Sequence, residues 1–317
     1  LETGCPAILD LLRAKDTERR TVFHYASTNK DTAVLAHLLK SVECVENTSN
    51  YDELCEILNI QDNEGKTVLH YASKLGLVHV QVVLESFKPG CPEKLKLLKY
   101  QDKHGATAFH SAFENTEERN TRRRRNRRQT AGINVINYKP KKTVLAYLLK
   151  SVECGENASN YDEFCKILNT QDNEGKTVLH YAAEWGLDYV TVLLKSFNPG
   201  CPQKLKLLKA RNKWNETACH IAARQWSPET LEYLFMSIDS VDKVTNYEEL
   251  LKILNSQTYR NKKTVLHCAA GGVHNVQVTL ELFKPGCPEI LELLEARDGL
   301  GKTVFHSAAC YQSNHML

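Results

Sequence analysis

The sequence lacks several features that would indicate particular classes of protein. No apolar run approaches the roughly 20 residues that a membrane-spanning helix needs. The first residues, LETGCPAILDLL, have neither the basic start nor the long apolar stretch of a secretory signal peptide. The sequence also contains no H-E-x-x-H, no G-x-S-x-G and no C-x-x-C pair with metal-ligand spacing. We therefore expect no catalysis, no bound metal and no cofactor.

A nucleotide-binding loop is excluded as well. Gly-Lys-Thr begins at Gly65, Gly175 and Gly301, but a phosphate-binding loop needs a further glycine five residues earlier. Those positions hold Ile60, Thr170 and Ala296.

Eleven cysteines are present, but their number is odd and their spacing is not that of a compact disulfide scaffold. A chain of 317 residues, 42% of them hydrophobic, can bury a core without disulfides. We therefore expect reduced thiols and a cytoplasmic location.

Cysteine precedes proline four times, a pair that is similar to the motifs of some haem-sensing proteins. Its recurrence at one position of a repeat favours a structural role instead, with cysteine as helix N-cap and proline as the first helical residue. These cysteines are Cys5, Cys91, Cys201 and Cys287.

Repetition dominates the rest of the sequence. The letters QDNEGKTVLHYA occupy residues 61–72 and return unchanged at residues 171–182. The shorter pattern T-x-x-H-x-A occurs seven times, at intervals of 46, 40, 70, 40, 47 and 39 residues. Removing 24 residues from the interval of 70 restores 46, so the third repeat carries an insertion of that length. The pattern begins at Thr21, Thr67, Thr107, Thr177, Thr217, Thr264 and Thr303.

Each repeat has the same parts in the same order. A turn such as DNEG comes first, with Asp, Asn and Gly where a tight turn needs them. Threonine follows as the expected helix N-cap, then a short helix such as VLHYAA, a glycine turn and a second apolar helix. A third short helix is expected before the next turn, of the type NYDELCEILN (residues 50–59) or PGCPEKLKLLK (residues 89–99).

This order of parts, with its T-x-L-H-x-A core, resembles the ankyrin repeat, whose T-P-L-H-x-A signature recurs about every 33 residues. The resemblance implies an all-α solenoid of stacked helix pairs, as a single array over residues 1–317. The chain departs from the family pattern because no copy has proline after the threonine and every interval is longer. The first residues match the later segment GCPEILELLEARDGLGKTVFHSAA, so we expect the array to continue upstream.

Seven of the twelve histidines occupy the same motif position. The resemblance implies that these imidazoles hydrogen-bond around the motif threonine and the neighbouring turns, which is a structural role. The threonine and histidine pairs include Thr67 with His70, Thr177 with His180, Thr217 with His220, and Thr264 with His267.

The resemblance also implies where another protein binds, because the turns and first helices of stacked repeats line a groove. All three tryptophans of the chain lie at such positions, and Trp and Arg are enriched at binding hot spots. The alternative is that each tryptophan packs against a neighbouring repeat. The expected partner-binding residues are Lys74, Leu75, Lys103, His104, Glu184, Trp185, Lys213, Trp214, Arg224, Gln225 and Trp226.

The insertion, residues 119–142, is strongly basic. It contains seven Arg, three Lys and no acid, so removing it changes the net charge from +3 to −7. Such runs bind nucleic acid, an anionic membrane surface or a nuclear import receptor, and the alternative is a flexible solvated loop. The basic cluster consists of Arg122, Arg123, Arg124, Arg125, Arg127 and Arg128.

Together these observations predict a protein–protein interaction scaffold or adaptor whose groove binds another protein. Two alternatives stay open. The chain can be the cytosolic repeat region of a larger protein, such as a channel or a host-directed effector. It can also bind nucleic acid without sequence specificity through the basic loop, and the Arg run makes a nuclear location an alternative to a cytoplasmic one.

Overall fold

The computed structural model describes residues 6–43, 48–88, 91–114, 142–152, 158–225, 227–239, 246–281 and 288–312. Within these ranges every regular element is a helix, as the sequence predicts. The chain divides into two compact units, Leu1–Ile167 and Leu168–Leu317. Each unit is a stack of helical repeats, and a single array over both units stays a prediction.

The first unit consists of short helices connected by turns. Its helices are α1 (Pro6–Arg13), α2 (Val22–Ala26), α3 (Ala33–Glu43), α4 (Thr48–Leu58), α5 (Val68–Leu75), α6 (Leu77–Glu85), α7 (Pro92–Lys99), α8 (Ala108–Ser111), α10 (Lys142–Ser151) and α11 (Ala158–Leu168).

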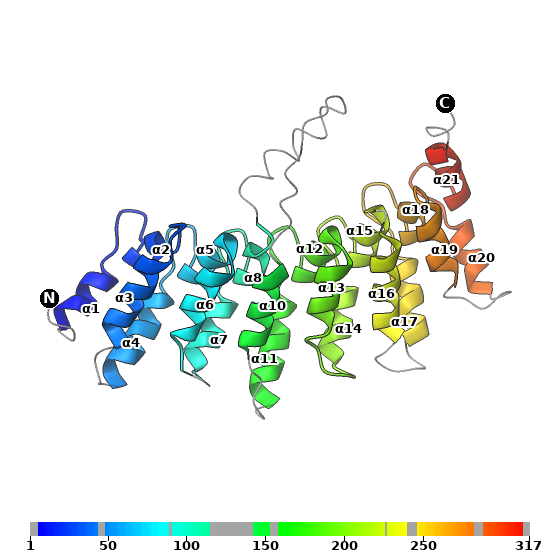
Figure 1. Ribbon diagram of the computed structural model, residues 1–317. Coiled ribbons are helices and arrows are strands. Elements are labelled where there is room, and N and C mark those ends of the chain that lie inside the picture. The colour runs from blue at the N-terminus through cyan, green and yellow to red at the C-terminus, as the bar shows by residue number, and fades with distance from the viewer. Residues whose placement is uncertain are drawn as a thin grey trace. The chain divides into compact units, whose positions relative to one another are not determined.

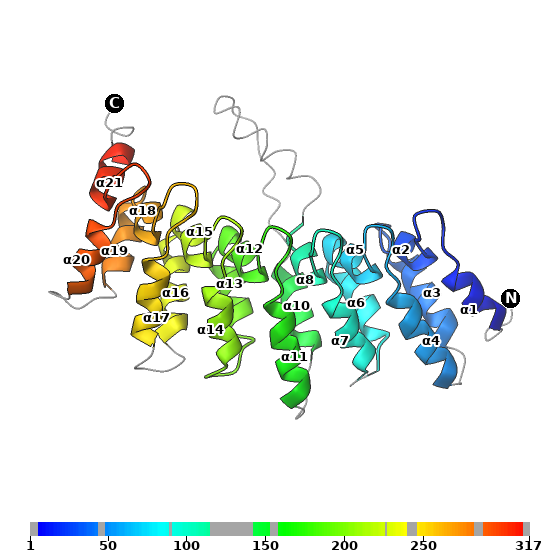
Figure 2. The ribbon, with the colours of Figure 1, turned by 180° about the vertical axis from the view of Figure 1, so that it is seen from behind.

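In this unit the first, second and third helices of successive repeats stack in three rows (Figure 1). The first row runs from α2 through α5 to α8, and the second from α3 through α6 to α10. The third row runs from α1 through α4 to α7. The reverse view shows the same order (Figure 2). The third short helix expected in each repeat is therefore present, as α4 and α7.

The second unit repeats this plan. Its helices are α12 (Val178–Trp185), α13 (Leu187–Leu194), α14 (Pro202–Lys209), α15 (Ala218–Arg224), α16 (Pro228–Asp239), α17 (Asn246–Leu254), α18 (Val265–Ala269), α19 (Val273–Glu281), α20 (Pro288–Glu295) and α21 (Val304–Gln312). The first helices α12, α15, α18 and α21 pack in sequence, and α16 lies between α13 and α19.

The apolar residues of the short first helix face the core because they recur at helical spacing. Val68, Leu69 and Ala72 of α5 are fully buried, and so are Val80 and Val83 of α6. Burial on this scale stabilises the stack by about 25 cal/mol per Å² of apolar surface. A lone repeat cannot cover its apolar face, so the neighbouring repeat is part of its fold.

Proline starts the third helix where cysteine precedes it. Cys91 and Cys201 are the N-caps of α7 and α14, and Pro92 and Pro202 are the first helical residues. Proline is tolerated there because its missing N–H would have no partner inside the helix. The predicted N-cap position is confirmed for these two cysteines, whereas Cys5 and Cys287 lie outside the described residues.

The basic insertion is almost wholly outside the described residues. The helix after it, α10, begins at Lys142, the last residue assigned to the insertion. Among the described helices, none combines the length and the apolar character that crossing a bilayer requires.

Candidate functional site

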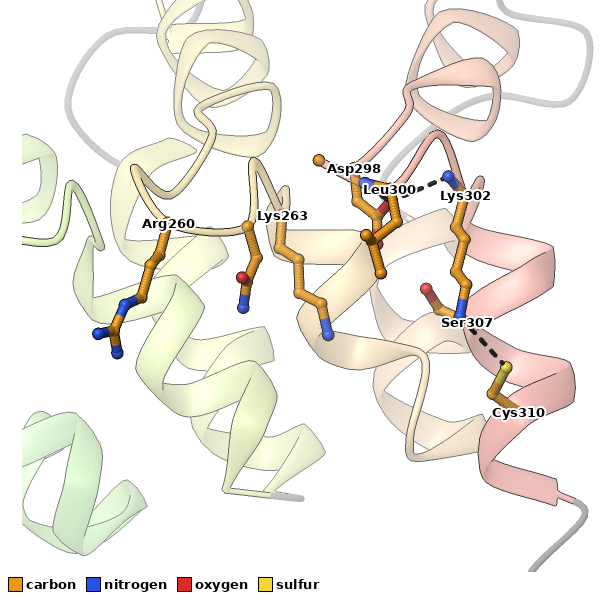
Figure 3. Close-up of a pocket in the computed structure, with 9 residues that line it drawn as sticks. Arg260, Lys263, Asp298, Leu300, Lys302, Ser307 and Cys310 are labelled. Carbon is orange, nitrogen blue, oxygen red and sulfur yellow. Dashed lines mark hydrogen bonds between the residues drawn. The ribbon is translucent and has the colours of Figure 1, made fainter.

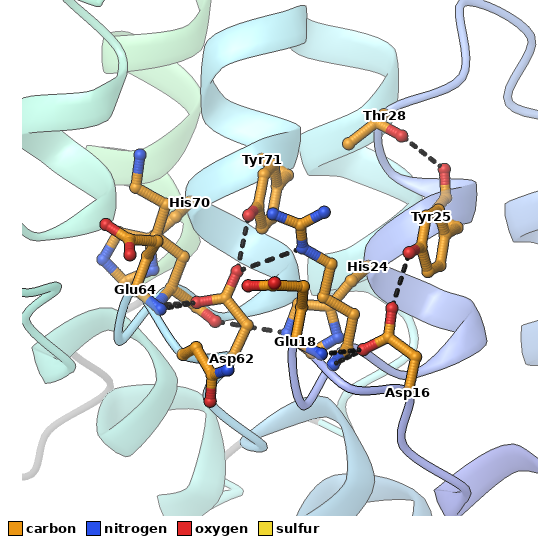
Figure 4. Close-up of polar contacts among 12 residues, drawn as sticks. Asp16, Glu18, His24, Tyr25, Thr28, Asp62, Glu64, His70 and Tyr71 are labelled. Carbon is orange, nitrogen blue, oxygen red and sulfur yellow. Dashed lines mark hydrogen bonds and ion pairs between the residues drawn. The ribbon is translucent and has the colours of Figure 1, made fainter.

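Each repeat begins with a tight turn, called the finger here, that one polar side chain organises. This side chain is an aspartate in five repeats, Asn212 in the fifth and Thr258 in the sixth. In the second repeat, Oδ1 of Asp62 accepts hydrogen bonds from the backbone N–H groups of Glu64 (2.9 Å) and Lys66 (2.8 Å). The hydroxyl of Tyr71 donates to Oδ2 of the same carboxylate at 2.5 Å (Figure 4). The finger is therefore fixed to its own first helix. The same arrangement joins Asp16 to Tyr25 and Asp172 to Tyr181.

The motif histidine connects one repeat to the next. Nδ1 of His70 lies 3.1 Å from the Thr67 N–H and 2.9 Å from the Thr67 hydroxyl, so Nδ1 accepts. The ring proton is then on Nε2, which donates to the carbonyl oxygen of Ala106 at 3.0 Å. The histidines that reach the next repeat in this way are His24, His70, His180, His220 and His267.

Burial favours the neutral form of three of these imidazoles. It lowers the pKa of His70, His180 and His220 to about 4, because a cation in the packed interface would lose its hydration. These three histidines are thus donors that hold repeats together rather than bases exposed to a ligand.

Backbone hydrogen bonds join neighbouring fingers into a continuous edge within each unit. In every case an N–H of one finger donates to a carbonyl oxygen of the finger before it, over 2.7 to 2.9 Å. The pairs are Asn63 to Glu18, Lys103 to Glu64, Lys213 to Glu174, Tyr259 to Trp214 and Gly299 to Asn261. Side chains at the finger tips are therefore held at fixed spacing along that edge.

Two of the four predicted partner-binding residues of the first unit form ion pairs with other residues of the chain. Lys74 pairs with Glu114 at 3.7 Å, and Lys103 pairs with Glu64 at 3.3 Å. His104 is exposed, and its backbone N–H is taken up by the aspartate of its own finger. Leu75 is half-buried at the end of α5.

The second unit brings three predicted residues together in one hollow of about 340 Å³. Glu184 is the second-last residue of α12, Trp214 lies in the finger before α15, and Arg224 is the last residue of α15. The residues that line the hollow with them include Lys176, Glu216 and Arg260.

Charge and aromatic surface meet in this hollow. The ammonium groups of Lys213 and Lys176 lie 4.7 and 5.7 Å from the centre of a Trp214 ring. Nη1 of Arg224 lies 2.6 Å from Oε1 of Glu216. Burial opposes ionisation of Glu216, but the Asn212 hydrogen bond and the charge of Arg224 outweigh it and lower the pKa of this carboxyl.

The remaining predicted residues do not line the hollow. Trp185 ends α12 with its ring centre 6.5 Å from that of Tyr189, a buried residue of its own repeat. Lys213 forms an ion pair with Glu174, and Gln225 is exposed at the end of α15. Trp226 and the six arginines of the basic cluster lie outside the described residues.

The prediction missed the cationic residues that follow this hollow in the next two fingers, Arg260, Lys263 and Lys302. One signal was available, because the repeat interval of 47 that ends at Thr264 makes the finger at residues 258–263 longer than its neighbours. In the described parts of the chain, no group of three or more His, Cys, Asp or Glu residues is arranged to hold a metal ion.

Comparison with known proteins agrees with the repeat anatomy. Residues 143–246 match the family model of ankyrin repeats (3 copies). A relative from Gallus gallus, phosphoinositide 3-kinase adapter protein 1, is 24% identical over 141 residues. That match covers 41% of this chain but only 17% of the relative's length.

A solved structure is also similar, the ankyrin repeat domain of Bcl-3, described as a unique member of the IkappaB protein family. The match has a TM-score of 0.49 and 19% identity, over 91% of this chain and 94% of that one.

Ankyrin repeats generally mediate protein–protein interaction, and proteins built from them are typically non-enzymatic interaction modules. The matched segment contains the same finger, motif threonine and histidine, and helix order that both units show. Residues 143–246 of the chain are therefore ankyrin repeats by this family model.

Proposed function

We propose that this chain is a scaffold or adaptor, without catalysis of its own, that binds another protein through the hollow around Trp214. The observation that carries the proposal is the convergence of Glu184, Trp214 and Arg224 on one hollow. A half-buried aromatic ring such as that of Trp214, set among charged side chains, is the kind of surface on which binding energy concentrates.

Two further points support an adaptor role. The relative from Gallus gallus is named an adapter protein, and residues 143–246 of this chain match a family of repeats that generally mediates protein–protein interaction. The finger edge is held by backbone hydrogen bonds, so a partner meets a surface that loses little conformational entropy on binding. We place this activity in the cytoplasm.

The experiment is a pull-down from nuclease-treated lysate, with captured proteins identified by mass spectrometry. The baits are the intact chain, the double variant Trp214→Ala with Arg224→Ala, and the control Met236→Ala. Met236 is 61% exposed on α16 and does not line the hollow. Circular dichroism checks that all three baits are folded.

We expect the intact chain and the control to capture the same discrete proteins and the double variant to lose them. Truncating a hot-spot residue typically weakens binding by about 2 kcal/mol or more. Retention of the same proteins by the double variant, or failure of the intact chain to capture any, would contradict the proposal.

A further inference from the structure

A second hollow, of about 290 Å³, lies beside the first in the second unit (Figure 3). It is formed by two successive fingers and by α21. Arg260 and Asn261 line both hollows, so the two are continuous. The charged residues of the second hollow are Arg260, Lys263, Asp298 and Lys302.

The second hollow has an excess of positive charge. Its one carboxylate, Asp298, already accepts hydrogen bonds from the backbone N–H groups of Leu300 (2.8 Å) and Lys302 (2.9 Å). This carboxylate therefore already shapes its finger, as Asp62 and Asp172 shape theirs. Three cations face one anion, so the hollow as a whole attracts negative charge.

Arg260 is an exposed cation of this hollow. Its side chain is exposed, and among the described residues none forms a hydrogen bond or an ion pair with it. Arg224, in the adjoining hollow, is by contrast already paired with Glu216. A guanidinium without a protein partner is suited to bidentate recognition of a carboxylate.

Apolar side chains border the same place. Leu300 is 80% exposed and lines the hollow, and Tyr259 is 72% exposed beside Arg260 on the preceding finger. Both are finger residues. The first unit carries Glu64 and His104 at the position of Leu300, and Asn63 and Lys103 at the position of Tyr259. A ligand that fits this surface combines negative charge with an apolar side chain.

A protein segment has this combination, and a nucleic acid fits less well. Outside the basic insertion the chain carries a net charge of −7, which repels an extended polyanion. A short acidic peptide places its charges in the cationic hollow alone.

We propose that Arg260, Lys263 and Lys302 bind an acidic segment of a protein partner, with an apolar side chain of that segment against Leu300. This inference rests on the proposed function, because it names the chemistry of the segment that the scaffold surface accepts. The acidic residues of the segment pair with the cations of the second hollow, and the rest of the segment continues toward Trp214 in the first hollow.

The test measures binding of a short fluorescein-labelled peptide of alternating glutamate and leucine to the full chain, by fluorescence polarisation. The matched probe replaces glutamate with glutamine, and a labelled single-stranded oligonucleotide of mixed sequence is the third probe. The variants are R260E and K302E, singly and together. The control is K262E, which makes the same charge change on the same finger outside the hollow.

We expect the acidic peptide to bind the intact chain at least tenfold more tightly than the glutamine peptide, and more weakly as salt is raised. R260E with K302E should weaken binding by roughly tenfold or more, and K262E by less than about twofold. Equal loss in K262E, no preference for the acidic peptide, or tighter binding of the oligonucleotide that R260E removes would each overturn the inference.

The pull-down separates this inference from the proposed function. If Trp214→Ala with Arg224→Ala releases captured proteins but R260E with K302E retains them all and the peptide shows no preference, the scaffold proposal stands and the acidic-segment inference fails. If no variant changes what is captured, both fail.

Discussion

His180 donates its Nε2 proton to the carbonyl oxygen of Glu216, 3.0 Å away in the following repeat. Its other nitrogen accepts from the backbone N–H and the hydroxyl of Thr177, so the ring can serve both repeats only in one neutral tautomer. Protonation of Nδ1 would place a second donor against two existing donors. The connection between repeats is therefore sensitive to acid.

This geometry predicts that the second unit loses stability as the pH falls from about 6.5 to about 4. Burial lowers the pKa of His180 and His220 to about 4, below the value near 6.5 of an exposed imidazole. The unfolded chain binds more protons than the folded chain in this window, so the free energy of unfolding decreases as pH falls. The contribution is fully present above pH 6.5, and one such site is worth on the order of 3 kcal/mol.

Urea unfolding at a series of pH values, followed by circular dichroism, measures this dependence. His180→Gln keeps an amide donor but cannot be protonated, so this variant should be less stable at pH 7 and show a shallower loss toward pH 4. A pH slope unchanged by the substitution would show that the acid sensitivity comes from other groups.

The hydrogen bond from the first-helix tyrosine to the finger aspartate should stabilise a buried finger more than an exposed one. Tyr71 is half-buried and donates to Asp62, which is 5% exposed, whereas Tyr25 is 52% exposed and donates to the exposed Asp16. Tyr71→Phe should lower the free energy of unfolding by roughly 1.5 to 3 kcal/mol, because it leaves a buried carboxylate oxygen without this donor. Tyr25→Phe is the matched control, and it should cost less than about 0.5 kcal/mol.

Denaturant unfolding of the two variants tests this comparison. The third repeat already has Ser111 in place of tyrosine, and Oδ2 of its Asp102 is buried without a hydrogen-bond partner among the described residues. A repeat can therefore fold without this bond. Equal cost for Tyr71→Phe and Tyr25→Phe would contradict the role of burial.

The repeat anatomy could be predicted from the sequence because its chemistry is local. Finger, motif threonine, histidine and three helices lie within one repeat, and seven copies make each assignment testable against the others. The hydrogen bond from His70 to Ala106 crosses repeats, but it recurs at the same spacing and follows from the motif.

The cationic hollow could not be predicted in the same way. It combines Arg260 with Lys302, which stand 42 positions apart in different fingers, and nothing in the repeat register shows that both line one hollow. Trp185, whose partner-binding role stays a prediction, also lies within reach of Tyr189, four residues later, which the motif does not show. Which side chains meet depends on how the stack packs rather than on the motif.

The fingers pack so closely that a single methyl group should distinguish two equivalent glycines. Gly175 and Gly301 occupy the same finger position, with φ values of +70° and +74°. A Cβ at Gly175 would lie 2.9 Å from the backbone nitrogen of Lys213, whereas a Cβ at Gly301 would meet nothing within 4 Å. Gly301→Ala should therefore lower the free energy of unfolding only by the penalty of placing alanine in the left-handed region, about 1 to 2 kcal/mol.

Gly175→Ala should lower the free energy of unfolding by at least about 1 kcal/mol more than Gly301→Ala does, because the neighbouring finger has to move as well. That movement strains the hydrogen bond from the Lys213 N–H to the carbonyl of Glu174. Urea unfolding measures the difference in stability, and hydrogen exchange at the Lys213 amide should become faster in Gly175→Ala alone. Equal destabilisation with an unchanged Lys213 exchange rate would mean that the fingers are less tightly coupled than their hydrogen bonds indicate.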